Sequence, residues 1–89
     1  MRIQVGDELR RICSQILSEG LSEGEWAARE SDDMFQSDMY AGGFDATEKA
    51  FCFSYYAADG SESWFQLTLD EVQQIAQGRL REISARSAE

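Results

Sequence analysis

The sequence predicts an α+β domain of two layers, a three-stranded antiparallel sheet (β-meander) with helices on one face, and three observations lead to this fold class. An aromatic-rich run without turn residues over 47–57 is followed by Asp59-Gly60 and a second strand-like run over 62–68. Segments with helical periodicity precede and follow these two runs. The expected order is therefore helix, short helix, three strands and helix.

The first helix is predicted by apolar residues that recur at helical spacing. They are Leu9, Ile12, Cys13, Ile16 and Leu17. Asp7 and Glu8 stand in the first turn, where negative charge favours the helix dipole, and Gly20 is a natural stop. We expect this helix to span about residues 7–19.

A short second helix is predicted by Ser22 and Glu25, which have the spacing of a capping box. It would continue through Trp26 and end near Glu30. Gly24 weakens it by about 1 kcal/mol relative to alanine.

The central hairpin depends on Asp59-Gly60, the preferred pair for a two-residue type I′ turn, in which both residues have positive φ. With these two residues as the loop, Ala58 faces Ser61, and the register of the two strands follows. That register places four aromatic residues on one face of the sheet: Phe51, Phe53, Tyr55 and Trp64.

The first strand of the sheet is predicted over residues 34–41, with Gly42-Gly43 as the turn that leads to the central strand. The linker is longer than the Asp59-Gly60 turn, so it constrains the register less.

The last helix is predicted by a second capping box, Thr68 with Glu71, followed by an apolar stripe. The stripe consists of Val72, Ile75, Ala76, Leu80 and Ile83. Gly78 either ends the helix, with a further helical turn beyond it, or is tolerated inside it at some cost. We expect residues 84–89 to fray and residues 1–89 to form one domain.

The composition is that of a folded, strongly acidic domain. Apolar residues make up 43% of the 89, and 17 acidic residues against 8 basic ones give a net charge of −9. Such a chain should repel nucleic acids and anionic membranes, so its natural charged partner would be a basic protein surface. The start lacks a secretory signal and no run is long enough to span a membrane, which predicts a cytoplasmic protein.

The residues that carry most chemistry at neutral pH are missing. The chain has no histidine, which removes catalytic triads, Cys-His dyads and most zinc sites, and no phosphate-binding or calcium-binding motif is present. Cys13 and Cys52 stand far apart among apolar neighbours, as buried free thiols do. We therefore expect no enzyme activity, no cofactor and no metal.

Two groups of residues are candidates for binding a partner. The first is an acidic patch of seven residues: Glu19, Glu23, Glu25, Glu30, Asp32, Asp33 and Asp38. A field of one sign steers a protein onto a basic surface, although acids of this kind also serve solubility alone.

The second candidate is the aromatic face of the sheet, with Phe51, Phe53, Tyr55 and Trp64. Aromatic residues rimmed by polar ones are typical interface anchors, and this face could join two copies of the chain. The alternative is that the last helix lies on them, which would make them core.

These expectations favour a non-enzymatic inhibitor that masks a basic site on a nuclease or another nucleic-acid-handling protein. Bacterial or phage proteins of the toxin-immunity and anti-CRISPR kinds are similar in size and charge only. The alternative is a homodimeric structural or adaptor module. Association through charge should weaken steeply with salt, whereas aromatic self-association should persist.

Overall fold

Two antiparallel sheets and three helices make up the part of the chain that the computed structural model describes, residues 2–29 and 35–87. In chain order these are β1 (Arg2–Gln4), α1 (Asp7–Ser18), α2 (Glu23–Ala28), β2 (Phe35–Gln36), β3 (Tyr40–Asp45), β4 (Ala50–Tyr56), β5 (Glu62–Leu67), α3 (Leu69–Ala76), β6 (Glu82–Ser84) and β7 (Arg86–Ser87). The larger sheet has five strands in the order β2-β3-β4-β5-β7, and β1 pairs with β6 in a small sheet of its own.

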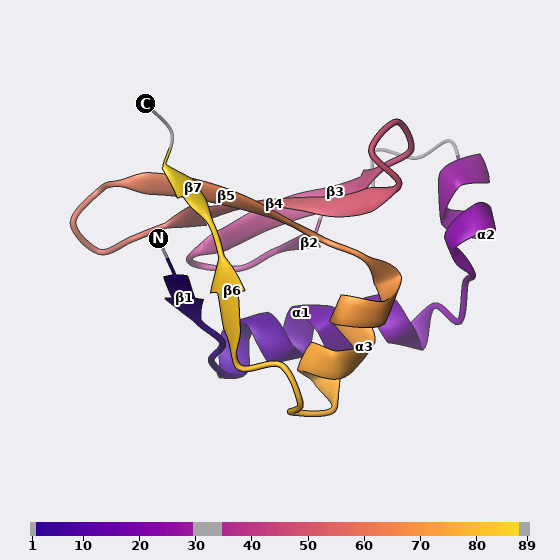
Figure 1. Cartoon of the computed structure of the whole chain (residues 1–89), viewed down its shortest axis with the longest axis horizontal. Coiled ribbons are helices and arrows are strands. Elements are labelled where there is room, and N and C mark those ends of the chain that lie inside the picture. Colours follow the sequence, from indigo (N-terminus) through magenta and orange to yellow (C-terminus); the bar gives the residue numbers. More distant parts are fainter. Residues whose placement is uncertain (1, 30–34, 88–89) are drawn as a thin grey trace.

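The predicted three-stranded sheet and element order are therefore wrong, although the class is α+β. Strand β1 precedes the first helix, and β6 and β7 follow the last one. Helices α1 and α3 lie side by side on one face of the larger sheet, with α2 at its far end (Figure 1). Strands β1, β6 and β7 were missed because each has only two or three residues, too short for a period-2 pattern. Strand β2 lies within the predicted first strand, residues 34–41, which residues 37–39 divide into β2 and the start of β3.

The helix predictions are confirmed at their starts. Helix α1 begins at Asp7, and Gly20 just beyond its end has a φ of +67°. Both capping boxes are formed: the side chains of Ser22 and Thr68 each accept a hydrogen bond from the main-chain N–H three residues on. Local side-chain chemistry is enough to fix the starts of α2 and α3.

The turn between β4 and β5 differs by one residue from the prediction. The N–H of Ala57 donates to the carbonyl of Ser61, and the N–H of Gly60 donates to the carbonyl of Ala57. Among the residues of the loop, only Gly60 has a positive φ (+87°). This is a type I turn followed by a glycine bulge, with a three-residue loop, and not a type I′ turn.

The changed loop length shifts the register by one residue. Phe53 faces Phe65 and Ser54 faces Trp64, where the predicted turn would set Phe53 against Gln66. Since side chains alternate between faces, every β5 side chain lies on the opposite face from the predicted one.

The predicted turn at Gly42-Gly43 is also wrong, because both glycines lie inside β3. A Cβ on Gly42 would overlap the carbonyl oxygen of Cys52 and lie 2.6 Å from Cδ1 of Phe53, so glycine serves close packing there. The actual turn covers residues 46–49, where Asp45 Oδ1 accepts from the N–H groups of Thr47 and Glu48. The predicted start at Met34 lies outside the described residues.

Helix α3 ends at Ala76, and the predicted helical turn beyond Gly78 is not formed. Gly78 has a φ of +76°, and the N–H of Arg79 donates to the carbonyl of Gln74, the bonding of a Schellman motif. Ile83 is buried as predicted, but it lies in β6 opposite Ile3. Residues 84–87, predicted to fray, complete β6 and form β7.

The core lies between the two helices and the sheet face that they cover. The helices contribute Leu9, Ile12, Cys13, Ile16, Val72 and Ile75, and the sheet contributes Tyr40, Phe51, Phe53, Phe65 and Leu67. Trp26 joins α2 to this core, with its ring centroid 5.3 Å from that of Phe51 and 6.3 Å from that of Phe44. A helix of six residues is held by such packing rather than by its own length.

Candidate protein-binding surface

The larger sheet has one face that no described helix covers. Helices α1 and α3 lie on one side of this sheet (Figure 1). Because side chains alternate along a strand, the residues between the core positions point to the other side. We call this surface the open face. It consists of Ala41, Gly43, Asp45, Cys52, Ser54, Tyr56, Glu62, Trp64 and Gln66, with Arg86 at its β7 edge.

The open face carries Tyr56 and Trp64, the two large apolar side chains that are exposed among the described residues. Their exposed fractions are 45% and 38%. Trp64 lies directly opposite Ser54, and Tyr56 is two residues along β4 from Ser54. Tyr56 and Trp64 are therefore diagonal neighbours across two strands, and between them present one aromatic surface.

Arg86 lies over the exposed ring of Trp64. Its guanidinium carbon is 5.3 Å from the ring centroid, within the range of a cation–π interaction, and the two residues are paired between β5 and β7. The cation holds the indole in place from the sheet edge. A preformed aromatic anchor loses less conformational entropy when a partner binds.

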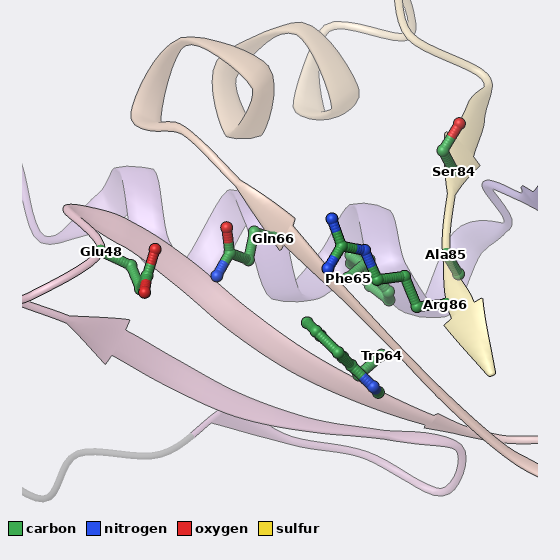
Figure 2. Close-up of a pocket in the computed structure, with 7 residues that line it drawn as sticks. All are labelled: Glu48, Trp64, Phe65, Gln66, Ser84, Ala85 and Arg86. Atoms are coloured by element: carbon green, nitrogen blue, oxygen red, sulfur yellow. The ribbon is translucent and has the colours of Figure 1, made fainter. Parts of the chain in front are cut away.

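A pocket of about 460 Å³ opens beside this pair (Figure 2). Its lining comes from the turn after β3, from β5 and from the C-terminal segment: Glu48, Trp64, Phe65, Gln66, Ser84, Ala85 and Arg86. The volume is in the range of small ligand sites, but the pocket is an open groove rather than a closed cavity.

The two thiols do not make this surface a nucleophilic site. Burial raises the pKa of Cys13 to about 12, and burial together with the nearby Asp45 raises the pKa of Cys52. Both cysteines are free and stay protonated at neutral pH, whereas the thiolate is the reactive form. Among the described residues, no cluster of acidic or cysteine side chains is arranged to hold a metal ion.

The four residues of the predicted aromatic face do not share a face. Phe51 and Phe53 are 0% and 1% exposed in the core, and Tyr55 is half-buried on the same side, 5.0 Å from Tyr40 between ring centroids. Trp64 lies on the open face. The one-residue change in register separates them, because it exchanges the two faces of β5.

The predicted acidic patch is divided by the fold. Glu19, Glu23 and Glu25 lie at the end of α1 and in α2, and Glu19 pairs with Arg29 at 3.7 Å. Asp38 lies in the loop between β2 and β3, at the opposite end of the sheet from α2 (Figure 1). The remaining members, Glu30, Asp32 and Asp33, lie outside the described residues.

Sequence reasoning missed Tyr56 and Arg86 as members of one surface. Tyr56 was already inside the predicted strand. A prediction with a three-residue loop in place of the two-residue turn would have put Tyr56 and Trp64 on the same face of the sheet. Arg86 had no comparable signal, because its position depends on a strand of two residues that pairs with β5.

Comparisons with known proteins give no further guide to the surface. No family model matches the chain, and no curated protein and no solved structure matches it. No helix within residues 2–29 and 35–87 has the length and apolar character needed to cross a membrane.

Proposed function

We propose that this protein is a non-enzymatic binding protein that docks its open face on a basic surface of another protein and masks that surface. The observation that carries the proposal is the uncovered sheet face with Tyr56 and Trp64, the exposed aromatics of a chain whose other large rings are buried or half-buried. Aromatic side chains in the middle of a surface with a polar rim are typical binding anchors.

The charge around the open face supports a basic partner. Asp45 and Glu62 lie on the face and Glu48 at its pocket, whereas Arg86 is already engaged with Trp64. The whole chain carries −9, so its long-range field attracts cations and repels nucleic acid. An inhibitor of a nuclease or another nucleic-acid-handling protein fits these properties, as immunity and anti-CRISPR proteins do by size and charge. Free cysteines are in keeping with a cytoplasmic location.

The test uses purified parent protein and a Tyr56→Ser/Trp64→Ala variant as baits for basic proteins in extracts of the native host. We expect the variant to lose capture while its urea unfolding midpoint stays close to that of the parent, because both side chains are exposed. Gln15→Ala, on the exposed side of α1, is the matched control. A variant that captures the same protein as well as the parent would place the contact elsewhere.

The charge contribution is measured on the captured partner. Glu48→Gln/Glu62→Gln should slow association about 10-fold at low salt, and the difference should narrow as salt rises. Glu23→Gln/Glu25→Gln in α2 tests the other acidic end of the molecule. If only the α2 variant slows association, the partner docks on the predicted acidic patch and not on the open face.

A second candidate function is a homodimer through the same face, which Tyr56 and Trp64 also favour. Two copies at −9 each repel one another, so such a dimer should strengthen with salt. Sedimentation of the parent at low and high salt measures whether a dimer forms and whether it strengthens with salt, and so separates the two functions.

A further inference from the structure

The edge of β5 is only partly paired. Strand β7 pairs with Ser63 and Trp64 of β5, and the chain before β7 turns away to form β6 against β1. Within the described residues, no strand pairs with β5 beyond Trp64 on this side. The groove of about 460 Å³ opens where the C-terminal segment diverges from β5 (Figure 2).

The main chain of Gln66 faces this groove. Ala57 and Ser61 form a hydrogen-bonded pair next to the turn, and bonded pairs alternate along an antiparallel ladder. The bonded residues of β5 toward β4 are therefore Ser63, Phe65 and Leu67, so the N–H and C=O groups of Trp64 and Gln66 point to the opposite edge. Trp64 pairs with Arg86 there, and Gln66 pairs with no strand of the described chain.

We propose that this edge accepts an extended segment of a partner protein as an added strand, which bonds to the N–H and C=O of Gln66 and places a lysine or arginine beside Glu48. Unpaired strand edges bind peptides in this way, with main-chain bonds for affinity and side-chain pockets for specificity. The proposal rests on the proposed function for the basic character of the partner, and names the part of that partner that binds.

The residues around the groove fit such a segment. Glu48 supplies a carboxylate, and the side chain of Trp64 offers an apolar surface on the open face. Glu48 and Arg86 are the charged residues that line the groove. Arg86 is held over the ring of Trp64, and Glu48 forms no ion pair with any described residue. An added strand would pair with the same edge of β5 as β7 does, next to the residues with which β7 pairs.

The test titrates ¹⁵N-labelled protein with acetylated Val-Lys-Val-Lys-Val amide, and with the same peptide carrying threonine or glutamate in place of lysine. We expect the lysine peptide to shift the Gln66 amide and Trp64 indole signals and to slow hydrogen exchange at the Gln66 amide. The glutamate peptide should bind at least about 10-fold more weakly. Equal binding of the threonine peptide would overturn the basic segment, and unchanged Gln66 exchange with all three peptides would overturn strand addition.

Gln66→Pro is the matched variant, because proline removes an N–H that points away from β4 and so spares the β4–β5 ladder. It should weaken the lysine peptide about 10-fold, whereas Gln66→Ala, which removes only the side chain, should bind as the parent does. Hydrogen exchange at the Gln66 amide of the parent protein tests the proposal without any variant.

One outcome separates this proposal from the proposed function. If Gln66→Pro captures the partner as well as the parent does, while the Tyr56→Ser/Trp64→Ala variant captures none, strand addition is overturned and the proposed function stands. Amide shifts that grow with protein concentration alone would show that a second copy occupies the edge, and would overturn the proposal.

Discussion

Gly42 shows how one residue position is decided by packing rather than by conformation. It lies in the middle of β3, opposite Phe53, and is buried. Its φ is not among the positive values, so its backbone is open to any residue. What requires glycine is the close approach of Cys52 and Phe53 to the place where a Cβ would stand. A glycine inside a strand is often of this kind.

Replacing Gly42 by alanine should destabilise the protein by about 3 kcal/mol or more, since two main-chain strands cannot move apart at small cost. The free energy of unfolding in urea measures this. Gly24→Ala is the control: apart from its two chain neighbours and the backbone of its own helix, no atom lies within 4 Å of the added Cβ, and alanine should stabilise α2 by about 0.5–1 kcal/mol. Equal effects of the two substitutions would contradict the tight packing of β3 on β4.

At the scale of elements, the three-residue loop between β4 and β5 determines which residues form the open face. Ala58 and Asp59 are the central residues of the type I turn, and Gly60 follows with positive φ. Asp59 Oδ1 accepts hydrogen bonds from the main-chain N–H and the hydroxyl of Ser61, at 2.9 and 2.7 Å. The side chain of Asp59 thus stabilises the three-residue loop that is observed, and not the two-residue turn that Asp59-Gly60 predicts.

Two substitutions in the loop should have opposite effects. Ala58→Pro places proline at the first central position of a type I turn and should stabilise by about 0.4–1 kcal/mol. Gly60→Ala forces a side chain to a positive φ and should cost about 1–2 kcal/mol. Denaturant midpoints of the two variants and the parent give both values. A destabilising Ala58→Pro would mean that Ala58 is a paired strand residue, as in the two-residue turn.

At the scale of the whole molecule, the small sheet brings the two ends of the described chain together. Arg2 and Gln4 of β1 both donate to the carboxylate of Glu82 in β6, at 2.9 and 2.7 Å. These bonds lower the pKa of Glu82 below its ordinary value of 4.5, the bond from Arg2 more than the bond from Gln4. A carboxylate on the surface thus joins segments about eighty residues apart.

The lowered pKa gives the sign of a pH effect. A group with a lower pKa in the folded state contributes stability above its ordinary pKa, and this is lost as pH falls through the folded value. Glu82→Gln should therefore lower Tm at pH 7, by no more than about 5 °C because the pair is exposed. The difference in Tm should shrink as pH falls below 4.5 and vanish once pH is below the folded pKa of Glu82. Glu62→Gln is the control variant, because it also removes one negative charge from the surface. A gap between Glu82→Gln and parent that is unchanged at low pH would show that these hydrogen bonds do not stabilise the charged form.

The candidate site could be predicted only in part from the sequence. Trp64 was a candidate interface residue, with burial under the last helix as the alternative, and it is exposed on the face that no described helix covers. Phe51 and Phe53 were grouped with it, but both are core residues. Their apolar character is the same in either place, so composition cannot separate core from interface, and the register that does so depends on one loop residue.

The sequence by itself determined the helix starts, the glycine stop at Gly20, and the existence of the hairpin between β4 and β5. Each depends on residues within a few positions of one another, where capping, positive φ and periodicity act directly. For Gly78 the sequence left two alternatives open, a helix end or a tolerated glycine inside the helix. The tertiary structure alone decided the register of β5, the burial of Gly42 and the pairing of β6 and β7. These follow from contacts between distant segments, and strands of two or three residues gain their stability from the strands they pair with rather than from their own sequence.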